Sequence, residues 1–125
     1  MINFKSYSCD CIMFPVSKYY DSTSNIFIAK VLKIKKQTPT SSISNVTVQI
    51  VENLKGKLMK KRIFNFVTDS NNNCDFNFNL GKTYLLFSHS VSGNYFVNSC
   101  SYSDNIINSK KTIKKLRTLE KLHQF

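Results

Sequence analysis

The amino-acid sequence predicts an all-β fold with a terminal helix, namely a five-stranded β-barrel of the OB type followed by a C-terminal amphipathic α-helix. Short runs of β-branched and aromatic residues recur along the first hundred residues, and such runs favour strands. Polar, Gly-containing or Pro-containing stretches separate them at short intervals, as in small barrels. Near the C-terminus the hydrophobic period changes from that of a strand to that of a helix.

Five segments are expected to form the strands. The early part of the first is apolar on both faces, which suits a barrel strand with a covered outer side, and the fourth also looks buried on both faces. Phe64 and Phe66 on the third strand should share one face. Gly56 suits a turn with positive φ at residues 52–57, and a second turn is expected at 89–93. The expected strands are residues 25–34, 46–51, 62–68, 82–87 and 94–98.

Helical structure is expected at both ends of the strand region. Residues 17–24 can form a short helix or a turn after Pro15, which breaks regular strand pairing. Ser103 or Asp104 can cap the long terminal helix. A basic amphipathic helix can lie on a membrane, but the narrow apolar stripe favours a helix packed on the barrel. That stripe consists of Ile106, Ile113, Leu116, Leu119 and Leu122.

The chain is strongly basic, with a net charge of +11 from 16 Lys, 2 Arg and 7 acidic residues. Such a charge is compatible with an anionic glycan or surface as partner, bound through the Lys-rich helix. Arg usually carries base and phosphate recognition, and the Phe and Tyr residues look like core rather than a stacking surface. We therefore expect no nucleic-acid partner.

Four cysteines are present, and two of them form the pair Cys9-x-Cys11. In an extended segment both side chains point the same way, so one short segment can be crosslinked to two distant places. Two disulfides in an oxidising compartment are expected, with three possible pairings. A zinc site of four thiolates is the rival interpretation, although its ligands normally come in closely spaced pairs. The expected location is secreted, whether extracellular or periplasmic.

Residues 1–8 are expected to be either a signal-peptide remnant or a flexible tail, and residues 9–125 a single domain. Ser6 and Ser8 would occupy the −3 and −1 positions of a cleavage site before Cys9. No run of about twenty apolar residues is present, so no transmembrane segment is expected.

The sequence offers little for an enzyme. His89 and His123 are the only histidines, and the seven acidic residues form no paired motif. There is no Gly-rich phosphate loop and no metal-binding His pair. We expect neither enzymatic activity nor a cofactor.

An ordered set of motifs points to a family. It comprises Cys9-x-Cys11, the strand Asn25-Ile26-Phe27-Ile28-Ala29-Lys30-Val31, Leu54-Lys55-Gly56, Phe66-Val67-Thr68 with Cys74 six residues on, Phe78-x-x-Gly81-Lys82-x-Tyr84-Leu85-Leu86-Phe87, and Ser99-Cys100-Ser101. In this order the motifs resemble the tissue inhibitors of metalloproteinases, more closely their N-terminal netrin-like domain, which is an OB fold. The resemblance runs from Cys9 to about Leu119.

The resemblance implies the disulfides Cys9–Cys74 and Cys11–Cys100. It also implies that Cys9, once it is the mature N-terminus, chelates the catalytic zinc of a target metalloproteinase through its α-amino group and carbonyl oxygen. The protein itself would hold no metal. Asp10 would enter the specificity pocket of the protease, and four further residues would contact the cleft. These are Cys11 and Ile12, which line it, and Asn72 and Asn73, which form an adjoining ridge.

Position 10 departs from the family pattern, which has a small hydroxyl residue there. A carboxylate in an apolar pocket costs at least a few kcal/mol unless a cation meets it. The Asp10 side chain therefore predicts weak or no inhibition of matrix-type metalloproteinases and leaves open a target with a basic or wide pocket. The alternative function is a netrin-like adhesion or ligand-binding module that meets an extracellular protein or glycan without inhibiting a protease.

Overall fold

The computed structural model describes residues 11–57, 59–72 and 74–122. Within these ranges, strands are the dominant elements and helices flank them. The helices are α1 (Val16–Ser22), the 3-10 helix η2 (Ile106–Asn108) and α2 (Lys110–Leu122). The strands are β1 (Asn25–Lys36), β2 (Ile43–Lys55), β3 (Ile63–Asp69), β4 (Thr83–Val91), β5 (Asn94–Val97) and the short β6 (Asp104–Asn105).

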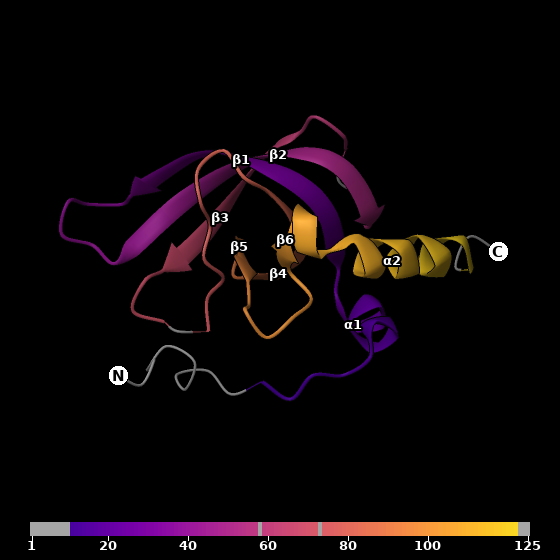
Figure 1. Cartoon of the computed structure of the whole chain (residues 1–125). Coiled ribbons are helices and arrows are strands. Elements are labelled where there is room, and N and C mark those ends of the chain that lie inside the picture. Colours follow the sequence, from indigo (N-terminus) through magenta and orange to yellow (C-terminus); the bar gives the residue numbers. More distant parts are fainter. Residues whose placement is uncertain (1–10, 58, 73, 123–125) are drawn as a thin grey trace.

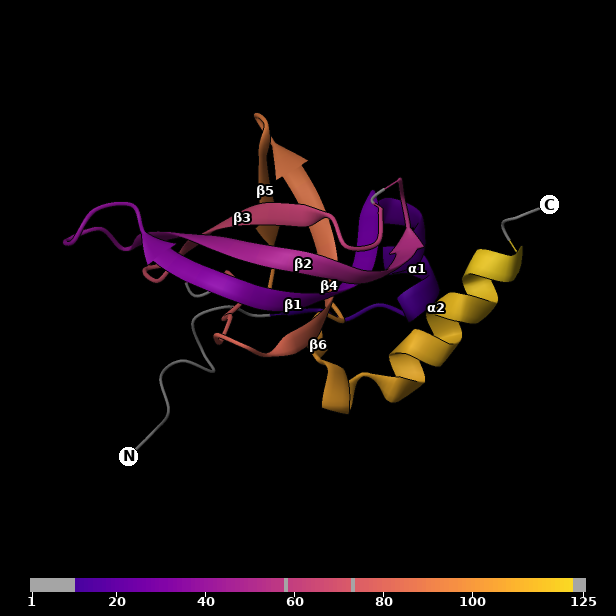
Figure 2. The same cartoon turned by 90° about the horizontal axis from the view of Figure 1, so that it is seen from above.

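The strands form an antiparallel sheet that curls into a half-barrel (Figure 1). The strand order is β3-β2-β1-β4-β5, so β1 pairs with both β2 and β4, and β6 pairs with β4. β3 and β5 contact each other across the open side of the curl. Figure 2 shows α1 and α2 together at one end, with the β1–β2 hairpin projecting from the other. The predicted all-β fold with a terminal helix is confirmed, and the half-barrel is compatible with an OB-like barrel.

The concave side of the sheet holds an inner core rich in aromatic rings. Phe64 and Phe66 on β3 are both buried, as their shared face predicts. The Phe66 ring stacks on Phe27 and on Phe78, with ring centroids 5.9 and 5.7 Å apart. The buried members of this core are Phe27, Ala29, Val31, Val46, Val48, Ile50, Phe64, Phe66, Tyr84, Leu86 and Val97.

A second core lies between the sheet and the two α-helices. Alternate residues of β1 and β4 point into it while their neighbours point into the inner core, so residues 26–29 of β1 and 84–87 of β4 are buried on both faces. This two-sided burial is what the sequence predicts for β4 and for the start of β1. The helix-side core consists of Tyr20, Ile26, Ile28, Leu54, Leu85, Phe87, Ile113, Leu116 and Leu119.

Two predicted turns are wrong in extent. β2 continues to Lys55 because Leu54 still packs into the helix-side core, so the turn is confined to the residues around Gly56. β4 continues to Val91 because it pairs with β5, so His89 lies on a strand and not in a turn. The exposed His89 ring stacks on Phe96, its register partner on β5, at a centroid distance of 6.0 Å.

The terminal helix also starts later than predicted. Ser103 is not its cap, because the Ser103 hydroxyl accepts a hydrogen bond from the backbone N–H of Phe87 at 2.8 Å. Asp104 instead belongs to β6, which pairs with β4. The side chain of Asn105 then caps η2 by accepting the N–H of Ile107 at 3.0 Å. Only after this 3-10 turn does α2 begin.

The turn after β2 fixes α1 to the sheet. Gly56 has a φ of +100°, in agreement with the prediction, and a Cβ at this position would lie 2.9 Å from the carbonyl oxygen of Ser24. Next to it, the Lys55 ammonium donates hydrogen bonds to the carbonyl oxygens of Tyr20 and Asp21. These carbonyls lie at the C-terminal end of α1, where a cation is favourable.

Candidate functional site

The disulfide between Cys11 and Cys100 joins the start of the described chain to the segment after β5. The two Cα atoms lie 5.2 Å apart, across a sequence separation of 89. This confirms one of the two pairings that the resemblance implies, and it excludes a zinc site of four free thiolates. Cys74 is also disulfide-bonded. Its expected partner, Cys9, lies outside the described residues, so the pairing Cys9–Cys74 stays a prediction. A disulfide fits an oxidising compartment.

Residues 11–14 follow the disulfide as an exposed segment, which we call the tethered edge. These residues belong to no strand or helix. Ile12 is 80% exposed, and Met13 and Phe14 are more than 40% exposed. Three neighbouring apolar side chains thus face solvent, and such exposure is common at sites that bind another protein.

Aromatic side chains hold the far end of the tethered edge. The Tyr102 hydroxyl donates a hydrogen bond to the carbonyl oxygen of Phe14 at 2.6 Å. The Lys18 ammonium lies 3.9 Å from the centre of the Phe14 ring. Tyr19 packs edge-on against Tyr102 and against Phe87, with centroid distances of 5.4 and 6.4 Å. Because Phe87 belongs to the helix-side core, the edge is anchored to the body of the fold at both ends.

The loop that carries Cys74 lies against the same region. The backbone N–H of Ser99 donates to the carbonyl oxygen of Cys74 at 2.7 Å, one residue before Cys100. Asp75 pairs with Asn98 in an isolated β-bridge. The disulfide partner of Cys11 and the Cys74 loop are therefore neighbours.

Side-chain hydrogen bonds shape this loop. The Asn72 side chain is exposed, and its oxygen accepts the N–H of Cys74 at 3.0 Å. The carboxylate of Asp75 accepts the N–H of Asp69 at 2.8 Å. Hydrogen bonds from the Ser42 side chain and from the N–H of Asn71 lower the pKa of the Asp69 carboxyl. The loop is thus ordered around fixed carboxylate acceptors.

The predicted site residues are therefore only partly placed. The structure places three of them, and all three are exposed: Cys11, Ile12 and Asn72. Cys9, Asp10 and Asn73 lie outside the described residues. Sequence reasoning missed the anchoring role of Tyr102, because its contact with Phe14 joins residues 88 positions apart and no local pattern signals it.

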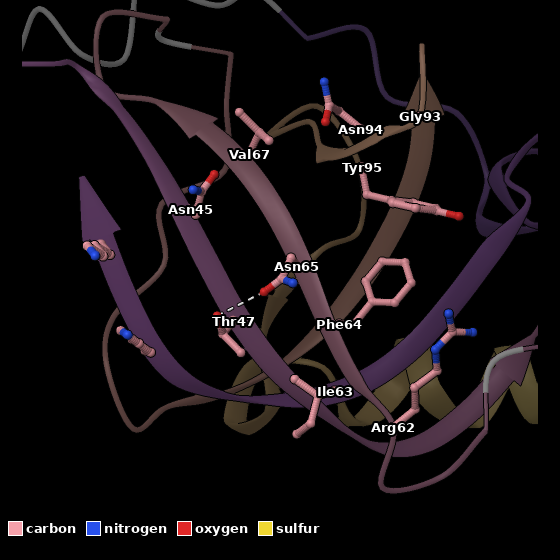
Figure 3. Close-up of a pocket in the computed structure, with 12 residues that line it drawn as sticks. Asn45, Thr47, Arg62, Ile63, Phe64, Asn65, Val67, Gly93, Asn94 and Tyr95 are labelled. Carbon is pink, nitrogen blue, oxygen red and sulfur yellow. Dashed lines mark hydrogen bonds between the residues drawn. The ribbon is translucent and has the colours of Figure 1, made fainter. Parts of the chain in front are cut away.

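A groove of about 610 Å³ runs from the outer face of β1, β2 and β3 round the β3 edge to Phe64, Tyr95 and the β4–β5 turn (Figure 3). Two rows of directly paired residues cross it. Lys33 pairs with Thr47 and Thr47 with Asn65, while Lys35 pairs with Asn45 and Asn45 with Val67. We call this the basic groove. It is lined by Lys33, Lys35, Asn45, Thr47, Arg62, Ile63, Phe64, Asn65, Val67, Gly93, Asn94 and Tyr95.

Contacts within the basic groove organise its polar and aromatic groups. The Thr47 hydroxyl donates to the side-chain oxygen of Asn65 at 2.9 Å, as Figure 3 marks. The Arg62 guanidinium lies 5.6 Å from the centre of the Phe64 ring. The Phe64 ring in turn meets Tyr95 at a centroid distance of 4.4 Å. The groove combines cations, amides and one partly exposed aromatic ring, a set that can bind an anionic, hydroxyl-bearing ligand.

In the part of the chain that the structure describes, no three His, Cys, Asp or Glu side chains are grouped so as to hold a metal ion. No helix in those residues is long and apolar enough to cross a membrane. No protein-family model matches this chain, and no curated protein matches it at a significant level.

Proposed function

We propose that this protein is a netrin-like module of the metalloproteinase-inhibitor type, acting on an extracellular zinc protease through the tethered edge. The observation that carries the proposal is the exposed segment at residues 11–14, held at one end by the Cys11–Cys100 disulfide and at the other by Tyr102. A segment fixed in this way loses little conformational entropy when it docks, so more of its contact energy is available for binding.

The strand arrangement supports the fold part of the proposal. In an OB-type barrel the first strand pairs on both sides and the sheet closes in Greek-key order. Here β1 pairs with β2 and β4, and β3 contacts β5 across the open side. That order is the one expected if the half-barrel is an OB-type barrel.

The proposed chemistry depends on cleavage between Ser8 and Cys9. A free α-amino group ordinarily has a pKa near 8, so a substantial fraction of such amines is neutral at physiological pH. A neutral amine and a carbonyl oxygen can occupy the open position of a catalytic zinc ion. Ile12 would then fill an apolar part of the cleft, and Asp10 would select a target whose pocket is basic or wide.

Substitution of Ile12 tests the docking edge. The protein would start at Cys9 and carry Asp10→Thr, and the probe would be the catalytic domain of a matrix metalloproteinase. We expect Ile12→Lys to weaken inhibition at least about ten-fold, because a desolvated ammonium replaces an apolar contact. Leu122→Lys is the matched control, because Leu122 is 67% exposed at the end of α2. Equal inhibition constants for the two variants would show that Ile12 on the tethered edge does not contact the protease.

The alternative function is a ligand-binding module that inhibits no protease. The basic groove favours this alternative, because its cationic, amide and hydroxyl side chains could hold a ligand. None of residues 11–14 lines the groove. The two functions use different surfaces and can be tested independently.

A further inference from the structure

Among the residues that the structure describes, the cations of the basic groove form no ion pair with a carboxylate. Arg117 and Glu52 form the one ion pair within the described residues, with a distance of 2.8 Å, and it lies outside the groove. No Asp or Glu of the described ranges lines the groove, whereas Lys33, Lys35 and Arg62 do. Three like charges around one concavity repel one another and raise the local positive potential. An anionic ligand would relieve that repulsion.

The sheet geometry spaces these cations. Lys33 and Lys35 are two positions apart on β1, so they share a face and lie roughly 6.6 Å apart along the strand. Arg62 immediately precedes β3, two strands away, and its contact with the Phe64 ring places it on the other side of the β3 edge from Asn65. Its carbonyl oxygen accepts the N–H of Ile50, three positions along β2 from the partner of Lys33, so Arg62 is also displaced from Lys33 by about 10 Å along the strands. Thr47 and Asn65 continue the row from Lys33 across the outer face to the β3 edge. The groove thus presents separated positive charges with neutral hydrogen-bonding groups in the middle.

This pattern suits an acidic sugar chain better than a nucleic-acid strand. Amide and hydroxyl groups match the hydroxyls of sugar rings, and the cations match carboxylate or sulfate groups on successive rings. Single-stranded nucleic acid requires exposed rings on which bases stack. Here the Phe64 ring is buried and is already engaged by Arg62 and Tyr95. Among the described lining residues Tyr95 alone has a partly exposed ring, and one ring does not provide a surface on which successive bases stack. The disulfide also fits a compartment where glycans are common partners.

We propose that the basic groove binds an acidic oligosaccharide, with Lys33 and Lys35 on one side and Arg62 on the other contacting its anionic groups. The site goes beyond the inhibitory edge and does not depend on it. It also differs from the Lys-rich helix that the charge pattern alone suggests. The pocket beside α2 is lined by cations of that helix together with the apolar side chains of Ile28 on β1 and Ile113 on α2, and by no described Asn or Gln.

Titration of the full, oxidised protein with a heparin octasaccharide tests the proposal. We expect the triple variant Lys33→Gln, Lys35→Gln, Arg62→Gln to bind at least about ten-fold more weakly than the unmodified protein. The matched control removes three charges from α2 by Lys110→Gln, Lys114→Gln and Lys121→Gln, and should change affinity less than about three-fold. All six side chains are exposed, so circular dichroism should show both variants folded.

Three results would overturn the assignment. Equal losses in the two triple variants would mean that binding follows net charge and not the groove. Absence of octasaccharide binding at low salt would show that acidic oligosaccharides are not the ligand. Tighter binding of a ten-residue oligothymidylate, with displacement of the octasaccharide, would make nucleic acid the ligand. Failure of heparin binding would leave the protease assays unaffected, because those assays probe the tethered edge.

Discussion

The double variant Cys11→Ser, Cys100→Ser is expected to lose about 4 kcal/mol of unfolding free energy. The disulfide closes a loop with a sequence separation of 89. For a loop of that length the chain-entropy treatment gives roughly 4.6 kcal/mol, and removal of native disulfides costs about 2–5 kcal/mol in practice. Replacing both cysteines avoids an unpaired thiol. Equilibrium denaturation in guanidinium chloride under non-reducing conditions measures the change.

A substitution beside the disulfide is the matched control. Ile12→Ser alters a side chain that is 80% exposed and should change the unfolding free energy by less than about 0.5 kcal/mol. A loss below about 1 kcal/mol in the double cysteine variant would be incompatible with the disulfide as a main constraint on the unfolded chain. It would also weaken the case for a rigid tethered edge.

Phe66→Ala should destabilise the fold by about 3–5 kcal/mol, the range for a large aromatic side chain deleted from a core. Phe66 is fully buried and stacks on both Phe27 and Phe78, so the surrounding rings cannot readily fill the space. Thermal and chemical unfolding would measure the effect. Ile63→Ala is the control on the same strand, because Ile63 is 51% exposed on the opposite face. Similar losses for the two variants would contradict the assignment of an inner core on the concave side.

The strands were predictable because their side-chain pattern is local. Within residues 62–68 the sequence Phe64-Asn65-Phe66 has the strand period of two, which places Phe64 and Phe66 on one face. The apolar run at residues 26–29 has no alternation, and the structure explains it by two cores on opposite faces of β1. Side-chain period and composition were sufficient for these elements.

The start of α2 could not be predicted from local pattern. Ser103 is a good helix cap by residue type, but its hydroxyl accepts the N–H of Phe87, which is 16 positions away in sequence. The same limit applies to His89, whose place on β4 follows from pairing with Phe96 on β5. In both cases a tertiary contact decides between two locally acceptable conformations.

The two candidate sites also differ in how far the sequence alone could predict them. The Cys11–Cys100 pairing was implied by resemblance, because four cysteines alone leave three pairings open. The basic groove was missed altogether, since Lys33, Asn45, Asn65 and Asn94 come together only through strand register and sheet curl. Its one sequence-level signal was the excess of basic residues, which does not say where on the surface they gather.

Inhibition by the protein with and without a free Cys9 amine tests the proposed function most directly. Protein that starts at Cys9 and carries Asp10→Thr would be compared with the same protein retaining Ser8, against the catalytic domain of a matrix metalloproteinase. We predict that the form starting at Cys9 inhibits and that retention of Ser8 weakens inhibition at least about 100-fold, because an amide nitrogen cannot bind zinc as an amine does. Equal inhibition by the two forms, or none by either, would contradict the proposed function.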